Sequence, residues 1–580
     1  MPETSNGGNS PAQPPKEISM EKRLLLAFLI MGGIMFVTPY LFKSVAPPVK
    51  KQTPTEQTAP ATPANNPPAA AEQKAEPKEA ETEAAAPTVP AIREQALPPL
   101  TIDTTLFRVT LSNQGGTVRS WLLKKYYATN GGKLLDLVNN ASGLDFPFSL
   151  YFPGQKPTVD VNKAAYRQSV EPDGLGVTYE FSDGHTSVRK TFRFERNSYL
   201  SHVSAEVSID GKPVPSMIEW RGGFGDLTVN NPSAPEYTLY YNLTDNKLAV
   251  QNARSAKNGP VTANGNYSFA GIADTYFAAV FLPQGGDSVQ MTTFADNVRT
   301  PGDQNKANFT GVALSDGSAN HFELFTGPKD LDLLKRVNPK LEQVVDFGWL
   351  SFMARPLFLL VNWFNTALVH NFGWAIIVAT VAINMALFPL KLSNMKSMRK
   401  MSALKPQIDT INAKYKNISI RDPRKSEQNQ EIMDLYKKHG VNPMGGCFPM
   451  LIQIPFFFAF YKVFTVSVDM RGAGWLWVTD LSQPEHIAIH ILPIIMIAAQ
   501  FWMQKMTPQP NTDRNQQMMM LFMPLIFGFM FYNLPSGLVL YYLTSTLVGM
   551  GQQWFFNHTD AAQAAARSVE PPPKKKSGRK

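Results

Sequence analysis

Hydrophobic residues divide the chain into a strand-like part and a helix-like part. Over residues 99–326, apolar and polar positions alternate, as at Phe107, Val109 and Leu111, and turn-forming residues recur between the alternating stretches. A period of two is typical of strands with one buried face. About 220 residues of short strands predict a large all-β sandwich domain.

Long apolar runs of the kind that cross a membrane occupy much of the rest. A transmembrane helix needs about 20 residues, and the candidate runs are 24–42, 372–390, 448–468, 487–503, 518–532 and 538–555. The first is uncharged over 19 residues. Because the core of a signal peptide has roughly 7–15 residues, we expect a retained anchor rather than a cleaved signal. The run 518–532 is short, at 15 residues, and a short helix can thin the bilayer around it.

Residues 327–371 join the β-domain to the second apolar run. Over 327–345, apolar positions recur at helical spacing, and Pro339 should kink that helix. Residues 356–369 are apolar but interrupted by polar side chains. We expect this second segment to lie along the membrane surface rather than to span it.

Positive charge predicts the topology. The segment 391–442 has the apolar spacing of a helical hairpin and carries twelve Lys or Arg, whereas the loop 469–485 carries only Arg471. Short loops rich in Lys and Arg stay in the cytoplasm, and the tail 556–580 is also basic. Six spans, with both termini inside and the β-domain outside, satisfy this rule. A further span at 356–369 would export the basic segment.

Composition adds two constraints. The net charge is +9 and 44% of the 580 residues are hydrophobic, which fits a membrane part joined to a soluble part. Residues 1–23 and the Pro-, Ala- and Glu-rich stretch 43–98 cannot build a core, so we expect a disordered cytoplasmic N-terminus and a periplasmic linker. Cys447 is the single cysteine, so no intramolecular disulfide can form.

Uncharged polar side chains interrupt the predicted spans. Asn384 lies near the inner end of its run, with Thr380 one turn away on the same face. Gln453 lies at a similar depth, and Tyr542 and Ser545 lie near the middle of the last run. Such groups either hydrogen-bond one another across helices or line a water-accessible groove in the inner leaflet.

The spans lack residues for covalent chemistry. Within the last five runs, Lys462 is the only Asp, Glu, Lys or Arg, and its flexible stem would let the ammonium reach the outer interface. The sequence contains no nucleophile–base pairing, nucleotide-binding loop or metal-ligand spacing. We therefore expect neither an enzyme nor a cofactor or metal site.

Several motifs are specific enough to compare with known families. They are Val345-Asp346-Phe347-Gly348-Trp349-Leu350, Val441-Asn442-Pro443-Met444-Gly445-Gly446-Cys447-Phe448-Pro449 with Leu451-Ile452-Gln453-Ile454-Pro455, and Leu534-Pro535-Ser536-Gly537-Leu538-Val539-Leu540-Tyr541-Tyr542. Phe269-Ala270-Gly271-Ile272-Ala273-Asp274 is a fourth. Together they resemble the bacterial YidC-type membrane protein insertases of the YidC/Oxa/Alb family.

This resemblance implies a multi-pass α-helical membrane protein with a five-helix insertase core and a periplasmic β-supersandwich. The implied activity is insertion and chaperoning of membrane proteins in the bacterial inner membrane, without enzymatic chemistry. The implied partners are nascent membrane proteins, the Sec translocon (SecYEG, SecDF), membrane lipids and the ribosome, but not DNA.

The resemblance also implies roles for single residues. The expected substrate groove contains Thr380, Asn384, Gln453, Tyr542 and Ser545. Candidates for an apolar surface along which a substrate helix slides are Phe457, Met520 and Met523. Recruitment in the cytoplasm would involve Lys396, Arg399 and Lys400.

One position departs from the family pattern. Many members carry an arginine where this chain has Asn384, and that charge is proposed to attract acidic residues of the substrate. Lys391, seven residues later and roughly on the same face, is expected to compensate in part. Two other functions stay open from the residues alone. A small-solute transporter would show internal repeats and a midplane site, and an assembly scaffold would act through its β-domain.

Overall fold

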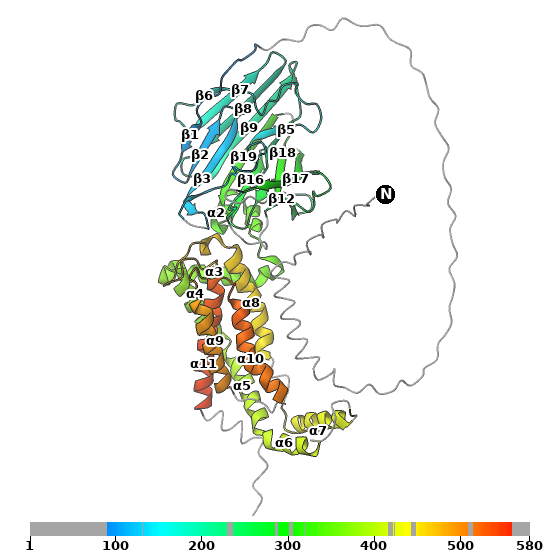
Figure 1. Cartoon of the computed structure of the whole chain (residues 1–580), viewed down its shortest axis with the longest axis vertical. Helices are drawn as coiled ribbons and strands as arrows, with labels where there is room; N and C mark the ends of the chain where they lie inside the picture. The colour runs from blue at the N-terminus through cyan, green and yellow to red at the C-terminus, as the bar shows by residue number, and fades with distance from the viewer. Residues whose placement is uncertain are drawn as a thin grey trace, which may run out of the picture.

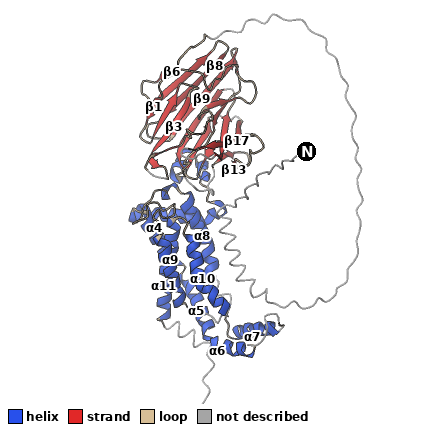
Figure 2. Ribbon diagram, viewed as in Figure 1, coloured by secondary structure: helices blue, strands red, loops and turns tan. Residues whose placement is uncertain are grey.

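The computed structural model describes residues 90–559 except 130–131, 229–235, 285–287, 301–305, 318, 416–421, 423, 442–447 and 508–513, and it describes no side chains for 448–451 and 514–521. The predicted N-terminal anchor, most of the linker and most of the basic tail lie outside these residues. Within the described part, a β-domain stands at one end of a bundle of helices (Figure 1, Figure 2).

Three antiparallel sheets form the β-domain. The largest has the order β13-β12-β15-β16-β19-β9-β8-β7-β6, with β10 paired to β9; its strands are β6 (Arg167–Val170), β7 (Gly176–Ser182), β8 (Thr186–Phe194), β9 (Leu200–Ile209), β10 (Lys212–Pro213), β12 (Tyr237–Asn242), β13 (Lys247–Asn252), β15 (Tyr267–Ala273), β16 (Phe277–Pro283) and β19 (Ala319–Pro328). The second has the order β14-β17-β18-β11-β5; its strands are β5 (Ser149–Tyr151), β11 (Met217–Trp220), β14 (Val261–Gly265), β17 (Val289–Arg299) and β18 (Lys306–Ser315). The third contains β1 (Leu100–Asp103), β2 (Phe107–Ser112), β3 (Thr117–Tyr127) and β4 (Leu134–Asp136).

Aromatic side chains from all three sheets meet in one core. The ring of Phe148, just before β5, lies 6.4 Å from Trp121 of β3, 5.3 Å from Phe192 of β8 and 5.7 Å from Trp220 of β11, between centroids. All four side chains are almost fully buried. Large buried aromatic rings contribute much apolar area and prefer such tilted contacts, so this cluster fixes the sheets relative to one another. The predicted all-β domain is confirmed.

Short helices lead from the β-domain to the bundle. β19 runs on to Pro328, and only then does α2 (Leu331–Val337) begin, followed by the 3-10 helix η1 (Pro339–Val344). The side chain of Asn338 accepts a hydrogen bond from the Lys340 backbone N–H and caps η1. Pro339 therefore splits the predicted amphipathic helix, as its missing N–H requires.

The bundle contains α4 (Phe372–Ala386), α8 (Phe448–Val466), α9 (Ile491–Met506), α10 (Arg514–Phe531) and α11 (Ser536–Asn557). The α9 helix begins at Ile491 instead of the predicted residue 487. The carboxylate of Glu485 accepts hydrogen bonds from the backbone N–H groups of Ile491 and Leu492, at 2.5 and 2.8 Å, and so caps the helix there. The α10 helix has 18 residues and begins at Arg514, before the predicted apolar run 518–532.

The predicted span 372–390 is not one straight helix. α4 ends at Ala386, and α5 (Phe388–Ala403) continues after a bend of 60°. Pro389 lies in the first turn of α5, where proline is tolerated because its missing N–H has no partner to lose. By length and composition, the described residues contain one helix able to cross a membrane, or two if this bent pair counts as one span. Six spans therefore remain a proposal.

The single helix that meets the length criterion, Gly348–Val369, lies across one end of the bundle. It comprises the short η2 (Gly348–Leu350), α3 (Ser351–Phe364) and the π-helical η3 (Asn365–Val369). Gly348 lies against Lys462, near the end of α8. Just beyond the segment, Asn371 donates to the Gly474 carbonyl in the loop after α8, at 3.0 Å. Both ends thus lie at the end of the bundle nearest the β-domain (Figure 1), which supports a position along the membrane surface.

The predicted helical hairpin is present. Its arms are α6 (Lys405–Lys414), which follows α5 after a break at Leu404, and α7 (Arg424–Lys438). Leu404 and Ile408 pack against Tyr436 and Val441 in a small core of their own. Pro406 in the first turn of α6 accounts for the break.

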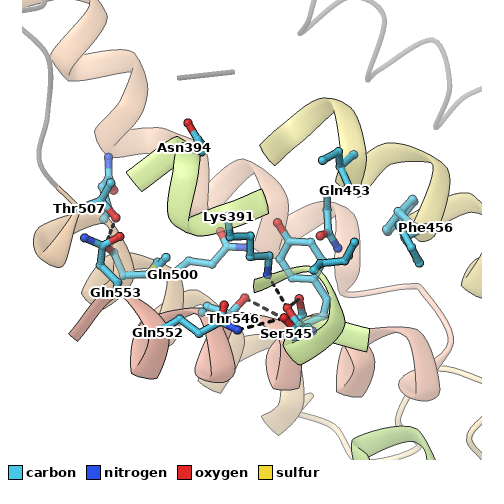
Figure 3. Close-up of a pocket in the computed structure, with 18 of the residues that line it drawn as sticks. Lys391, Asn394, Gln453, Phe456, Gln500, Thr507, Ser545, Thr546, Gln552 and Gln553 are labelled. Carbon is cyan, nitrogen blue, oxygen red and sulfur yellow. Dashed lines mark hydrogen bonds between the residues drawn. The ribbon is translucent and has the colours of Figure 1, made fainter. Parts of the chain in front are cut away.

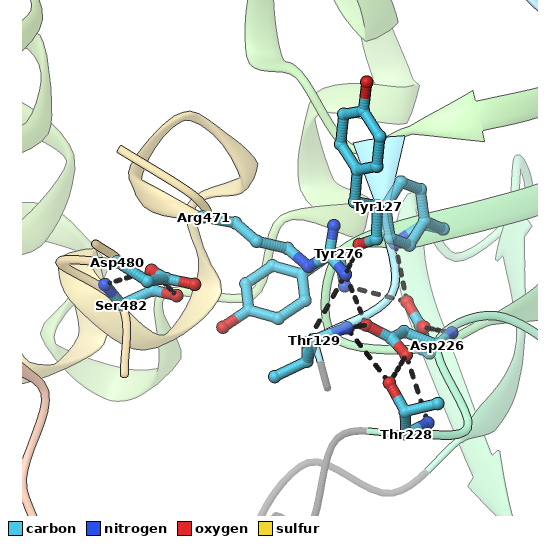
Figure 4. Close-up of polar contacts among 10 residues, drawn as sticks. Tyr127, Thr129, Asp226, Thr228, Tyr276, Arg471, Asp480 and Ser482 are labelled. Carbon is cyan, nitrogen blue, oxygen red and sulfur yellow. Dashed lines mark hydrogen bonds and ion pairs between the residues drawn. The ribbon is translucent and has the colours of Figure 1, made fainter. Parts of the chain in front are cut away.

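One arginine connects the β-domain to the bundle. Arg471, in the loop between α8 and α9, forms an ion pair with Asp226 and also donates to the Tyr127 carbonyl, at 2.6 Å (Figure 4). The two charged side chains are 5% and 0% exposed. Asp226 also accepts a 2.8 Å hydrogen bond from the Thr129 hydroxyl. Removing one partner of a buried pair leaves an uncompensated charge, so this contact holds the two parts together.

We expect Arg471→Met to loosen the contact between the β-domain and the bundle by about 3–5 kcal/mol, because Asp226 would remain buried without its cation. Hydrogen exchange of the loop 467–490 in detergent-solubilised protein measures this. Arg108→Met is the control, because its ion pair with Asp103 is exposed on both sides and should contribute at most about 1 kcal/mol. Unchanged exchange in Arg471→Met would contradict the prediction.

Candidate functional site: a polar cavity between the helices

The bend at Leu387 brings a lysine against an asparagine. The Leu387 N–H donates to the Ile383 carbonyl and closes α4, and the Lys391 N–H donates to the Leu387 carbonyl and begins α5. Helical side chains tilt toward the helix N-terminus, so Lys391 points back toward α4. Its ammonium donates a hydrogen bond to Oδ1 of Asn384. The bend therefore places a positive charge beside an amide within the bundle.

Asn384 ties α4 to α11. Its Nδ2 donates to the Thr380 carbonyl at 2.8 Å, and its Oδ1 also accepts from the Ser545 hydroxyl at 3.3 Å. Gln552 of α11 donates from Nε2 to the Asn384 backbone carbonyl at 3.1 Å. Asn384 is only 4% exposed to solvent. The sequence left two alternatives for Asn384, hydrogen bonds to other helices or the lining of a groove. The first of these, hydrogen bonding between helices, is present.

Gln453 makes a second connection to α11. Its Nε2 donates to the Tyr541 hydroxyl at 2.8 Å, and the Tyr541 ring stacks on Phe460 of α8 with centroids 4.1 Å apart. The next residue, Tyr542, packs instead against Phe531 of α10, at 4.9 Å between centroids. α11 therefore contacts α4 through Ser545 and Gln552, α8 through Tyr541 and α10 through Tyr542.

A cavity of about 490 Å³ lies among these helices (Figure 3). Its polar lining is Asn384, Lys391, Asn394, Gln453, Gln500, Gln504, Thr507, Tyr541, Tyr542, Ser545, Thr546, Gln552 and Gln553, and its apolar lining includes Met395, Met398, Phe457, Met503, Met523 and Phe527. Lys391 is the one charged side chain among the described residues of this wall. Most of these positions lie in the half of each helix remote from the β-domain.

Four of the five predicted groove residues line this cavity. They are Asn384, Gln453, Tyr542 and Ser545. Thr380 is fully buried, its hydroxyl donates to the Ile376 carbonyl at 2.6 Å, and it is not part of the cavity wall. Its contribution is indirect, because its carbonyl accepts the Asn384 amide.

Sequence reasoning overlooked the glutamines of α9 and α11. Gln500 and Gln504 are one turn apart on α9, Ser545 and Gln552 are two turns apart on α11, and all four line the cavity. Polar residues repeated at helical spacing within an apolar helix were the available signal. Proximity along the chain was not a reliable guide, since Thr544, next to Ser545, is buried and donates to the Leu540 carbonyl.

Three polar atoms at the cavity lack a partner within the described part of the chain. They are Nε2 of Gln500, Oε1 of Gln552 and Oδ1 of Asn394, each inaccessible from the surface. A buried polar atom without a hydrogen bond costs about 1–3 kcal/mol, and such atoms in polar cavities are usually satisfied by water or ligand. These three atoms have no accessible surface, so water in the cavity depends on the other polar side chains of the lining.

The other predicted residues have mixed surroundings. Phe457 and Met523 line the cavity, but Phe457 is 1% exposed and packs against Phe458 and Phe531, so it does not face lipid. The Met520 side chain lies outside the described residues. The exposed apolar side chains of α10 are Phe522, Leu525, Ile526 and Phe529. On α5, Lys396 is exposed, and Arg399 and Lys400 are partly buried.

Comparison with known proteins agrees with these features. A family model described as "YidC periplasmic domain" matches residues 99–360, and one described as "60Kd inner membrane protein" matches 363–563. The membrane protein insertase YidC of Geotalea uraniireducens (strain Rf4) is 32% identical over 568 residues, covering 93% of this chain and 99% of the relative. The chain belongs to the YidC family of membrane protein insertases.

A second curated relative and a solved structure also match the chain. The YidC of Syntrophus aciditrophicus (strain SB) is 32% identical over 565 residues, with the same coverage. A crystal structure described as an active YidC insertase with its first transmembrane domain resolved has 20% identity and a TM-score of 0.35, covering 80% of this chain and 95% of that chain. YidC proteins are insertases and not enzymes, and the family match indicates a bacterial inner-membrane protein with a periplasmic domain. The transporter and scaffold alternatives are not favoured.

Ser545→Cys, in a Cys447→Ser background, should react with a water-soluble maleimide about tenfold faster than Thr544→Cys, because only a thiol in contact with water ionises readily. The two positions are neighbours on α11 and differ in that only Ser545 lines the cavity. The labelling rate in membrane vesicles measures this. Equal, slow labelling of both cysteines would mean that the cavity is dry.

Proposed function

We propose that this YidC-family chain inserts nascent membrane proteins into the lipid bilayer and helps them fold, using the polar cavity as an inner-leaflet groove. The observation that carries the proposal is a cavity inside an apolar bundle that combines amides, hydroxyls and one cation with methionine and phenylalanine side chains. The polar atoms would receive the hydrophilic end of a substrate hairpin. Flexible methionines suit apolar partners of many shapes.

The energetic benefit lies in a shorter path through hydrocarbon. A charged residue at the centre of a transmembrane helix costs about 2.5–3.5 kcal/mol on insertion scales. Keeping one such residue out of the bilayer centre therefore raises the insertion rate by roughly 100-fold. The substrate's apolar helix would then leave along α8 and α10, where the exposed Phe522, Leu525, Ile526 and Phe529 offer an apolar surface.

The proposed topology has six spans, at 24–42, 372–390, 448–468, 487–503, 518–532 and 538–555, with both termini in the cytoplasm. The periplasm would contain the domain at 99–326 and the loop with Arg471. The hairpin 391–442 would lie in the cytoplasm. The charge difference between these segments supports this arrangement. The exposed aromatic side chains Trp349, Phe352 and Trp363 support an interfacial α3.

The proposed partners follow from the same arrangement. Nascent membrane proteins are the substrates, alone or delivered through the Sec translocon (SecYEG, SecDF). The basic hairpin, with Lys396, Arg399 and Lys400 at its start, would contact the ribosome or anionic lipid.

We further propose that Lys391 supplies the groove cation that an arginine supplies in many family members. The contact between its ammonium and Asn384 Oδ1 supports this role, and so does its place on the cavity wall. A cation surrounded by apolar side chains attracts a carboxylate more strongly than one in bulk water.

Lys391→Met should slow insertion of a substrate with an acidic tail roughly tenfold, and a neutral-tailed substrate much less, because a charge-assisted hydrogen bond is lost only with the former. Insertion into proteoliposomes measures both rates. Lys396→Met is the matched control for the ratio of the two rates: this exposed lysine of the same helix does not line the cavity, so the loss of its charge should affect both substrates alike. An equal slowing of both substrates by Lys391→Met would count against the charge role.

Asn384→Arg should keep insertion close to that of the unsubstituted chain. An arginine at this place can donate to the Thr380 carbonyl as Asn384 does, and the long Lys391 side chain can turn away from it toward water. The same proteoliposome assay checks this. Complete loss of insertion would show that the site requires an uncharged residue beside Lys391.

A further inference from the structure

A tight turn in the loop between α8 and α9 carries apolar side chains at its tip. The Trp475 N–H donates to the Val478 carbonyl at 2.8 Å, and the Val478 N–H donates to the Trp475 carbonyl at 2.9 Å. Leu476 and Trp477 therefore form a two-residue loop of the kind that closes a β-hairpin. These two residues are 66% and 38% exposed, so the turn presents a leucine and a tryptophan to its surroundings.

Leu476 has a backbone conformation that suits a different residue. Its φ is +51°, in the left-handed region, where a leucine side chain crowds the backbone and only glycine or asparagine is common. Two-residue hairpin loops prefer such residues for this reason. An exposed leucine there gains nothing in water, whereas an apolar environment would offset the strain by burying its side chain. The sequence of the turn therefore suits a tip that leaves water.

Packing fixes this turn at the level where α4 begins. The Trp475 ring lies 5.6 Å, between centroids, from the ring of Trp374 in the first turn of α4. A side chain at Gly373 would collide with the Trp475 ring, and Asn371, which caps α4, donates to the Gly474 carbonyl. In the proposed topology α4 enters the bilayer at its first turn, so the tip lies at the outer membrane interface.

The side chains at this level have the chemistry of a membrane interface. Residues 472–479 include no Asp, Glu, Lys or Arg. The α3 helix, which lies across the same end of the bundle, exposes Trp349, Phe352 and Trp363, and Trp374 of α4 is 47% exposed. Tryptophan concentrates where lipid meets water because its ring is apolar and its N–H is polar. A lipid surface is the partner that contacts exposed side chains of α3, α4 and the turn at one level.

We propose that the tip Leu476-Trp477 inserts into the outer leaflet of the bilayer and anchors the loop between α8 and α9 there. The inference goes beyond the proposed insertase function and rests on the proposed topology of α4. The same loop holds the β-domain through the ion pair of Arg471 with Asp226. It thus connects the β-domain to the lipid as well as to the helices, and the bilayer helps to orient the domain.

The test measures the depth of the tip with a nitroxide label on the full chain in proteoliposomes. The label is attached to Leu476→Cys in a Cys447→Ser background, and its paramagnetic relaxation is measured with oxygen, which concentrates in lipid, and with a neutral nickel chelate on both sides of the membrane. Val170→Cys is the control, since Val170 is 46% exposed and belongs to β6, at the end of the β-domain away from the helices (Figure 1). The ratio of oxygen to nickel relaxation should be roughly tenfold higher at Leu476→Cys, because hydrocarbon excludes a polar chelate.

A second variant tests whether the tip holds the loop at the membrane. The Leu476→Asn/Trp477→Gly double variant gives the turn the sequence that two-residue hairpin loops prefer, so the turn should persist without its apolar tip. The label is then placed on Thr479→Cys, an exposed position just after the turn. Relaxation by nickel at this label should rise severalfold over that of the chain with its own tip, because the burial of two apolar side chains is lost.

Three results would overturn the inference. Nickel relaxation at Leu476→Cys equal to that at Val170→Cys would place the tip in water. Weak relaxation by both reagents would mean that protein covers the tip, either another segment of this chain or a second copy. Unchanged nickel relaxation at Thr479→Cys in the double variant would show that the tip does not anchor the loop. None of these results touches the insertase function, which the insertion assay measures separately.

Discussion

Polar atoms inside an apolar bundle must find a hydrogen-bonding partner, and this requirement organises the whole helical part. Asn384, Gln453 and Ser545 meet it through one another and through neighbouring helices. The glutamine atoms at Gln500 and Gln552 do not meet it within the described residues. Gln552 still meets it in part, since its Nε2 donates to the Asn384 carbonyl.

The bend between α4 and α5 and the packing of α11 place these polar side chains around the cavity. The 60° change of direction between α4 and α5 turns Lys391 back toward Asn384, and Pro389 lies in the first turn of α5, just after this bend. The last helix, α11, then contacts α4, α8 and α9 and presents a different polar side chain to each of several neighbours. A change in the tilt of α11 would therefore alter every wall of the cavity at once.

The β-domain is attached at the opposite end of the helices. Arg471 reaches from the loop between α8 and α9 into the base of the domain, where Asp226 and the Tyr127 carbonyl receive it. α3 lies across the same end, beside Lys462 and Gly474. The cavity thus occupies the part of the bundle that is remote from the β-domain.

The sequence by itself determined the class of elements and pointed to several of the residues that line the cavity. Alternation at Phe107, Val109 and Leu111 predicted buried strand positions, and isolated amides within apolar runs predicted Asn384 and Gln453, because both signals arise from burial along one element. Three features depended on the tertiary structure. The bend at Leu387 decides where Lys391 points, the packing of α11 decides that Ser545 faces the cavity while Thr544 does not, and the packing of α9 against α11 decides that Gln500 and Gln504 line it. Such features arise from contacts between residues far apart in the chain, which no local pattern encodes.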